Sequence, residues 1–139
     1  MDGQDLGAGV ELRQFFVISL HFGQQGLSCF PPLLAGHGGT RDSMLPEAQL
    51  LTAQGYGALT LDYRQCAGRP VGLGALEVEE FRAALDFVQA QPGVEWIAAL
   101  GFSAGGSAVL RGSVSRPEVR AVIAEGHYAN LWSEILLTP

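Results

Sequence analysis

Short apolar runs recur along most of this chain, and each has the length of a strand. Residues 57–63 (GALTLDY), 94–101 (VEWIAALG) and 119–124 (VRAVIA) are mainly apolar and lie between glycine, proline or polar residues. Runs bounded in this way are typical of buried strands. A shorter run at residues 33–35 ends in glycines and predicts one more short strand.

The segments between these runs have apolar residues near helical spacing. Residues 43–54 predict a helix that ends at Gly55. Residues 75–91 place apolar side chains on one face and acidic side chains elsewhere, which predicts an amphipathic helix with a solvated acidic face. Residues 104–115 are small and apolar, so we expect a helix that packs closely against its neighbours.

Strands and helices alternate from residue 32 onward, which indicates βαβ units. Such units build a mostly parallel sheet with helices on both faces. The predicted fold class is therefore α/β, with about four to five strands in one domain core at residues 32–139. Residues 1–31 are a poorly defined N-terminal segment in which residues 13–22 are the one candidate strand.

Composition excludes several classes of protein. The 139 residues are 47% hydrophobic and 16% charged, enough to bury a core. Fourteen acidic residues against eight basic ones, all arginine, make nucleic acid or an anionic membrane surface a poor partner. No apolar run approaches the length of a membrane span, and the acidic N-terminus is unlike a signal peptide. We therefore expect a soluble, cytoplasmic protein.

Cysteine and histidine are too few and too scattered for a disulfide framework or a zinc site. The two cysteines, Cys29 and Cys66, have no CxxC spacing, and the three histidines lie far apart in the sequence. Nothing else in the sequence implies a metal ion or an organic cofactor.

The segment GFSAGG at residues 101–106 carries the strongest chemical signal. It fits G-x-S-x-G between a predicted strand and a predicted helix, the context of a nucleophile elbow. Gly101, Gly105 and Gly106 would let strand and helix approach closely around Ser103. Ser103 would act as the nucleophile, and the amide of Ala104 would face an oxyanion at the helix N-terminus. The alternative is a glycine-rich turn in which Ser103 is only a helix N-cap.

A second glycine-rich segment, AGHGGT at residues 35–40, follows the first clear strand. A loop in this position can supply a second backbone N–H to an oxyanion hole, and His37 is the candidate donor. The alternative is an ordinary glycine turn with an exposed His37.

From Leu33 to Leu131 the chain resembles the first half of an α/β-hydrolase, in particular serine esterases and peptidase-like hydrolases related to prolyl oligopeptidase and dienelactone hydrolase. The matching pieces, in order, are AGHGGTRDSMLPEAQLLTAQGYGALTLDYR, the helix at residues 75–91, WIAALGFSAGGSAVL and VRAVIAEGHYANL. The segment Asp62-Tyr63-Arg64 resembles the D-Y-R-G-x-G-x-S stretch after the fourth strand of that fold. The resemblance implies a partial α/β-hydrolase fold that lacks the C-terminal strands.

The chain also departs from this family. Ala35-Gly36 stands where the family usually has His-Gly, and Gln65 stands where it has glycine. In this fold the catalytic acid and histidine normally follow later strands than the one at residues 119–124. Glu125 and His127, just after that strand, are the candidate substitutes for acid and base. The alternative is that Glu125 caps the sheet edge and His127 begins a loop.

Two hypotheses for function remain. The first is a serine hydrolase that cleaves an ester, amide or peptide through an acyl-enzyme on Ser103. The second is a catalytically silent, truncated hydrolase relic that acts as a binding or dimerising module. The exposed sheet edge left by the missing strands would pair with a second copy or with a complementing chain.

Overall fold

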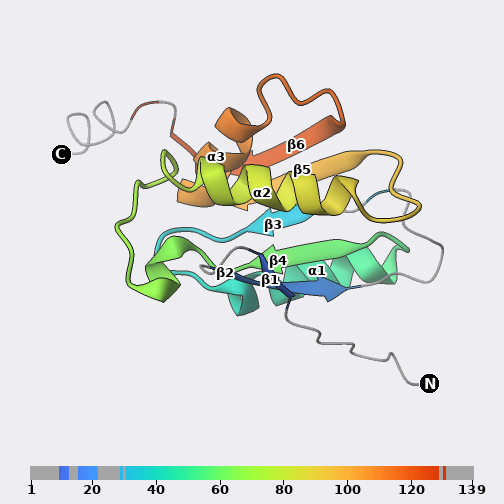
Figure 1. The fold of residues 1–139 in the computed structure, drawn as a ribbon, viewed down its shortest axis with the longest axis horizontal. Helices are drawn as coiled ribbons and strands as arrows, with labels where there is room; N and C mark the ends of the chain where they lie inside the picture. The colour runs from blue at the N-terminus through green and yellow to red at the C-terminus, as the bar shows by residue number, and fades with distance from the viewer. Residues whose placement is uncertain (1–9, 13–15, 22–28, 30, 129, 131–139) are drawn as a thin grey trace.

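A computed structural model describes residues 10–12, 16–21, 29, 31–128 and 130 of the chain. These residues form one six-stranded sheet in the order β1-β2-β4-β3-β5-β6 (Figure 1). Strands β4, β3, β5 and β6 run parallel, whereas β1 and β2 are antiparallel to their neighbours. The predicted α/β class is confirmed. The strand bounds are β1 Val10–Leu12, β2 Phe16–His21, β3 Pro32–Leu34, β4 Ala58–Leu61, β5 Ile97–Phe102 and β6 Val119–Glu125.

Helices cover both faces of the sheet, as expected for parallel strands. Figure 1 shows α2 across the near face beside α3, with α1 behind β4. The N-terminal part of the predicted first helix is a 3₁₀ turn, and the predicted loop after β4 contains a second one. The helix bounds are η1 Arg41–Met44, α1 Leu45–Ala53, η2 Arg64–Ala67, α2 Val78–Gln89 and α3 Ala104–Gly112.

The sheet extends further toward the N-terminus than the sequence pattern predicts. Residues 1–31 contribute two strands, β1 and β2, where the sequence shows one candidate. β2 pairs antiparallel with β4, from Ile18 opposite Leu61 to His21 opposite Ala58. This pairing converts β4 from an edge strand into an interior strand of the sheet, and all four residues of β4 are buried.

The core contains buried residues of α2 and α3 together with Met44 of η1 and Ala48 of α1. Phe81 and Leu85 of α2 are fully buried, together with Leu33 of β3 and Ile97 of β5. Burial of side chains of this size stabilises a fold by about 1.5–3 kcal/mol each, measured against full exposure. Because β3 and β5 are adjacent at the centre of the sheet, this core rigidly supports the loops that follow both strands.

The acidic face predicted for the helix at residues 75–91 is wrong in part. Glu77 and Glu80 are only 3% and 4% exposed. The Glu80 carboxylate forms an ion pair with the Arg64 guanidinium, with Nε 2.7 Å from Oε1. The Glu77 carboxylate accepts hydrogen bonds from the backbone amides of Gly72 (2.8 Å) and Gly74 (2.6 Å). These partners come from other segments, so helical periodicity alone does not reveal them.

Among the described strands β6 forms one edge of the sheet, and no described helix covers it on the sheet face that carries α1. Along β6 no residue is fully buried, and the Ile123 side chain is 60% exposed. No helix among the described residues is long and apolar enough to cross a membrane.

Candidate active site

Ser103 lies at the junction between β5 and α3, in a strained backbone conformation. Its φ of 51° and ψ of −117° place it in a region that residues with side chains rarely occupy, at a cost of about 1–3 kcal/mol. The Ser103 amide donates to the Glu125 carbonyl at 2.8 Å, which anchors the turn to β6. The turn leaves Ser103 exposed at the carboxyl edge of the sheet.

The turn requires glycine because α3 approaches the strands very closely. A Cβ atom on Gly105 would lie 2.4 Å from the carbonyl oxygens of Leu34 and Ala35. A Cβ atom on Gly101 would lie 2.4 Å from the Gly105 carbonyl oxygen. Side chains at either position would push α3 away from the sheet and shift Ser103, which begins the helix.

The glycine loop after β3 lies directly beside Ser103. A Cβ atom built on Gly36 would be 3.4 Å from the Ser103 Cβ atom. The next residues form a tight turn in which the Gly39 amide donates to the Gly36 carbonyl at 3.0 Å and Gly38 has a φ of 79°. A positive φ at the third position, without one at the second position (His37), is the pattern of a type II turn. The turn thus carries the His37 amide close to the serine.

Two backbone amides at this site donate no hydrogen bond to another described residue. Among the hydrogen bonds of the described residues, none is donated by the amide of His37 or of Ala104. The Ala104 amide begins α3, where the helix dipole favours negative charge. Free amides at a helix N-terminus and in a neighbouring loop suit the binding of an oxyanion.

Tyr63 supports the glycine loop from beneath. Its hydroxyl donates to the Ala35 carbonyl at 2.6 Å and touches the position of Gly105. Burial raises the pKa of the Tyr63 phenol far above its usual range, and the nearby charges of Glu77 and Glu80 raise it further. The hydroxyl therefore keeps its proton and remains a donor. It supports this loop through the Ala35 carbonyl.

Beside the loop lies an open hollow of about 250 Å³. Its lining includes Gly36 and His37 of the loop, Glu47 of α1 and Phe102, the residue before Ser103. The hollow therefore provides space for a small group next to the serine.

Glu125 is the last residue of β6 and His127 follows it at the same edge, but among the described residues neither side chain forms a hydrogen bond with Ser103. Glu125 is exposed and contributes its carbonyl to the Ser103 amide. The exposed His127 ring has its Nδ1 atom 3.2 Å from the Ala124 carbonyl. The His127 backbone lies over α3, because a Cβ atom on Gly106 would be 3.0 Å from the His127 Cβ atom.

A network of hydrogen bonds holds the segment that carries His127. The Ser107 hydroxyl donates to the Tyr128 carbonyl at 2.9 Å, and the same oxygen is 3.1 Å from the Tyr128 amide. The Tyr128 hydroxyl donates to the carbonyl of Leu73, which has a φ of 48°. The amides on either side of Leu73 bind Glu77, as described above. Sequence reasoning missed these supports because each joins residues from separate loops.

Solved structures resemble this arrangement over most of the chain, whereas no protein-family model and no curated protein sequence matches it. A dienelactone hydrolase of Anabaena variabilis matches with a TM-score of 0.76 and 23% identity, over 89% of this chain and 63% of its own. A 2,6-dihydroxy-pseudo-oxynicotine hydrolase matches with a TM-score of 0.75 and 19% sequence identity. The match covers 89% of this chain and 37% of that hydrolase. An esterase of Pyrococcus furiosus matches with a TM-score of 0.71 and 21% sequence identity. The match covers 86% of this chain and 50% of the esterase.

These likenesses define the fold. The chain has the α/β-hydrolase fold, as the resemblance implies, and it has only part of it. It spans between 37% and 63% of the length of these three hydrolases. Its structural neighbours are hydrolases, among them esterases.

Proposed function

We propose that the chain carries the nucleophile of a serine hydrolase that cleaves a small ester, amide or peptide. The observation that carries this proposal is the strained, exposed Ser103 between β5 and α3, with the free amides of His37 and Ala104 nearby. Strain of this kind is stored where it holds a reactive group in place. The hydrolase neighbours support the same class of chemistry.

In the proposed reaction the Ser103 Oγ atom attacks the substrate carbonyl carbon as a base removes its proton. The carbonyl oxygen becomes an oxyanion that accepts hydrogen bonds from the His37 and Ala104 amides. The alcohol or amine leaves with that proton, and the acyl group remains on Ser103. Water then attacks the acyl carbon and gives a proton to the base. The bond between the acyl carbon and the Ser103 Oγ atom breaks as the base returns that proton to Oγ, which releases the acid and restores the free serine.

His127 is our candidate for the base. If its Nδ1 atom carries the proton and donates it to the Ala124 carbonyl, Nε2 is left as the acceptor. A carbonyl would then orient the ring as a carboxylate does in a complete triad. The Glu125 carboxylate remains the candidate acid, and its influence would be electrostatic because the ring nitrogen contacts Ala124.

Intact-mass analysis after treatment with a fluorophosphonate serine probe tests the proposal. We expect a single adduct on the folded chain and none on Ser103→Ala. His127→Ala should then slow labelling by several orders of magnitude, as removal of a catalytic base does in other serine hydrolases. The absence of an adduct on a wild-type chain that circular dichroism shows to be folded would overturn the proposal.

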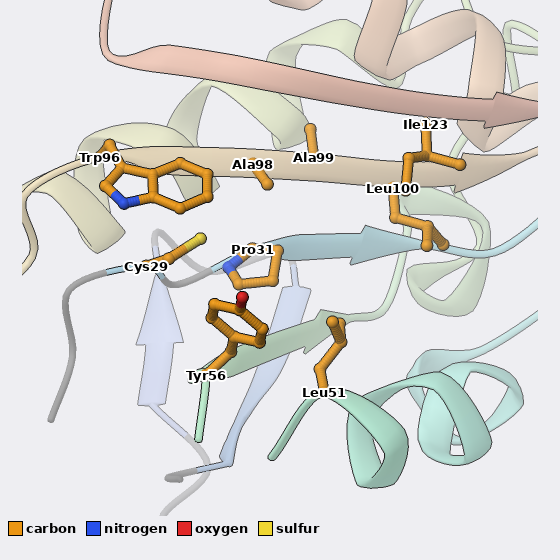
Figure 2. A pocket seen from close by; sticks show the side chains of 9 residues that line it. All are labelled: Cys29, Pro31, Leu51, Tyr56, Trp96, Ala98, Ala99, Leu100 and Ile123. Atoms are coloured by element: carbon orange, nitrogen blue, oxygen red, sulfur yellow. The ribbon is translucent and has the colours of Figure 1, made fainter. Parts of the chain in front are cut away.

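A second candidate function is a dimerising module. The sheet face at β5 and β6 that no described helix covers favours this function. Figure 2 shows a hollow on the face that carries α1, lined by apolar side chains of β5, β6, α1 and nearby loops. Trp96 and Leu100 border it, and Ile123 points into it from β6. Pairing of β6 with β6 of a second copy about a two-fold axis would cover both edges and bring the two hollows together.

A further inference from the structure

Gln65 stands out among the residues around the glycine loop. It stands where the α/β-hydrolases that the sequence resembles have glycine. It is not the first residue of a strand or of an α-helix. In the structure it lies in η2, after β4, with its side chain half-buried against residues 36–39. The proposed reaction assigns it no role.

Both polar atoms of the Gln65 carboxamide bind the turn that carries His37. The Oε1 atom accepts from the Gly38 amide at 3.4 Å, and the Nε2 atom donates to the Gly39 carbonyl at 3.1 Å. A side-chain amide that both accepts and donates imitates a neighbouring strand. It therefore holds two peptide groups of the loop at once, the one before Gly38 and the one after Gly39.

The Gly38 amide is the decisive contact because it belongs to the central peptide of the turn. Type I and type II turns differ in the orientation of this peptide, which is reversed between them. The φ of 79° at Gly38 shows that the turn is type II. An acceptor placed beside the Gly38 amide stabilises this orientation over the other, and Gln65 supplies it.

We propose that Gln65 is a positioning residue of the oxyanion loop. It fixes the type II turn of residues 36–39 and thereby holds the His37 amide beside Ser103. This inference rests on the proposed function, since it concerns the amide that would bind the oxyanion. Tyr63 holds the start of the loop at Ala35 and Gln65 holds its end, so the amide between them is fixed from both sides.

The test compares Gln65→Leu and Gln65→Glu with the wild type and with a control, Gln89→Leu. Leucine removes both hydrogen bonds, whereas glutamate keeps an acceptor for Gly38 and loses the donor to Gly39. Gln89 is exposed at the end of α2, at the opposite edge of the sheet from Ser103. Two quantities are measured on each protein: hydrogen exchange of the Gly38 and Gly39 amides by NMR, and the rate and affinity of fluorophosphonate labelling.

For Gln65→Leu we expect faster exchange of the Gly38 amide and about tenfold slower labelling at saturation, with unchanged probe affinity. Gln65→Glu should retain most of the protection of Gly38, and Gln89→Leu should behave as wild type. A role in stability alone would lower the melting temperature without this selective loss of the labelling step. Unchanged Gly38 exchange in Gln65→Leu would overturn the inference, and so would faster exchange with unchanged labelling.

The two proposals fail in different ways. If the folded wild type is not labelled, the proposed function fails, and the positioning role fails with it. If the wild type is labelled and Gln65→Leu is labelled equally fast, only the role of Gln65 is overturned.

Discussion

Tyr63 shows how one buried hydroxyl supports two parts of the candidate site. Its hydrogen bond to the Ala35 carbonyl is short, at 2.6 Å, and its ring is 2% exposed. The phenol lies under both β3 and the start of α3, since it touches the Gly105 position. The glycine loop and the turn that carries Ser103 therefore share one support.

We predict that Tyr63→Phe lowers the free energy of unfolding by about 1–3 kcal/mol, because the Ala35 carbonyl loses its buried partner. Urea unfolding near neutral pH measures this loss. Fluorophosphonate labelling should slow as well, since the loop is freed at its start. A variant as stable as wild type would contradict the importance of this hydrogen bond.

The raised pKa of Tyr63 also predicts a dependence of stability on pH. The unfolded phenol titrates near pH 10, whereas burial raises the folded pKa above this value. Above about pH 10 the unfolded state thus binds fewer protons than the folded state, and stability falls as the pH rises. Urea unfolding at a series of alkaline pH values should show a steeper fall for wild type than for Tyr63→Phe. Equal slopes would contradict the prediction.

At the residue scale the sequence predicts the tight turn at Ser103 and the two glycine segments beside it, because the G-x-S-x-G pattern constrains the backbone locally. It does not identify Glu77 or Glu80 as buried, since their partners are loop amides and Arg64 from elsewhere in the chain. In the sequence Gln65 is notable only because it replaces the glycine of the D-Y-R-G pattern. Its proposed role depends on hydrogen bonds to Gly38 and Gly39, which lie in the loop after a different strand.

At the scale of elements, two ion pairs of Arg64 join η2 to α2. The Arg64 guanidinium contacts the buried carboxylate of Glu80 and the exposed carboxylate of Glu79, and it donates to the Leu76 carbonyl at 3.0 Å. These contacts raise the pKa of Arg64, the largest effect being its hydrogen bond to Glu80. The charge on Arg64 is therefore permanent, and its partners decide the cost of its burial.

We predict that Glu80→Ala destabilises the fold by about 3 kcal/mol, because removal of one partner strands a charge with 8% exposure. Glu79→Ala is the matched control. Glu79 pairs with the same Arg64 guanidinium, but the Glu79 side chain is 78% exposed. Exposed pairs contribute little, so its cost should be about 0.5 kcal/mol. Thermal or urea unfolding of both variants compares their stabilities directly. Equal losses of unfolding free energy would contradict the prediction that burial makes the Glu80 pair the more important one.

Long, strongly patterned elements were predictable at this scale. The strands β4, β5 and β6 lie where continuous apolar runs predict them, and the helix α2 lies where apolar residues at helical spacing predict it. The strand β1 has three residues and shows no period. The 3₁₀ turns η1 and η2 are too short for helical spacing to reveal, so the sequence predicts a helix start and a loop there instead.

For the whole molecule, the bare edge at β6 leads to a prediction about self-association. If a second copy pairs there, light scattering after gel filtration should show a dimer whose fraction rises with concentration. Ile123→Lys should keep the chain monomeric. Val114→Lys is the control, because Val114 is exposed to a similar degree, 64% against 60%, and lies outside the hollow. A wild type that stays monomeric at all concentrations would exclude this surface as a self-association site.

The strand order also has a consequence for how the chain reaches its native state. β3 lies between β4 and β5, and Leu33 pairs with Leu100 and Leu34 with Gly101. These partners are distant in the sequence, and such non-local pairings form slowly because a long loop must close first. Gly36 and Ser103 meet only when this pairing exists. Any folding intermediate without it has no assembled site, so reactivity of Ser103 would report the completion of folding itself.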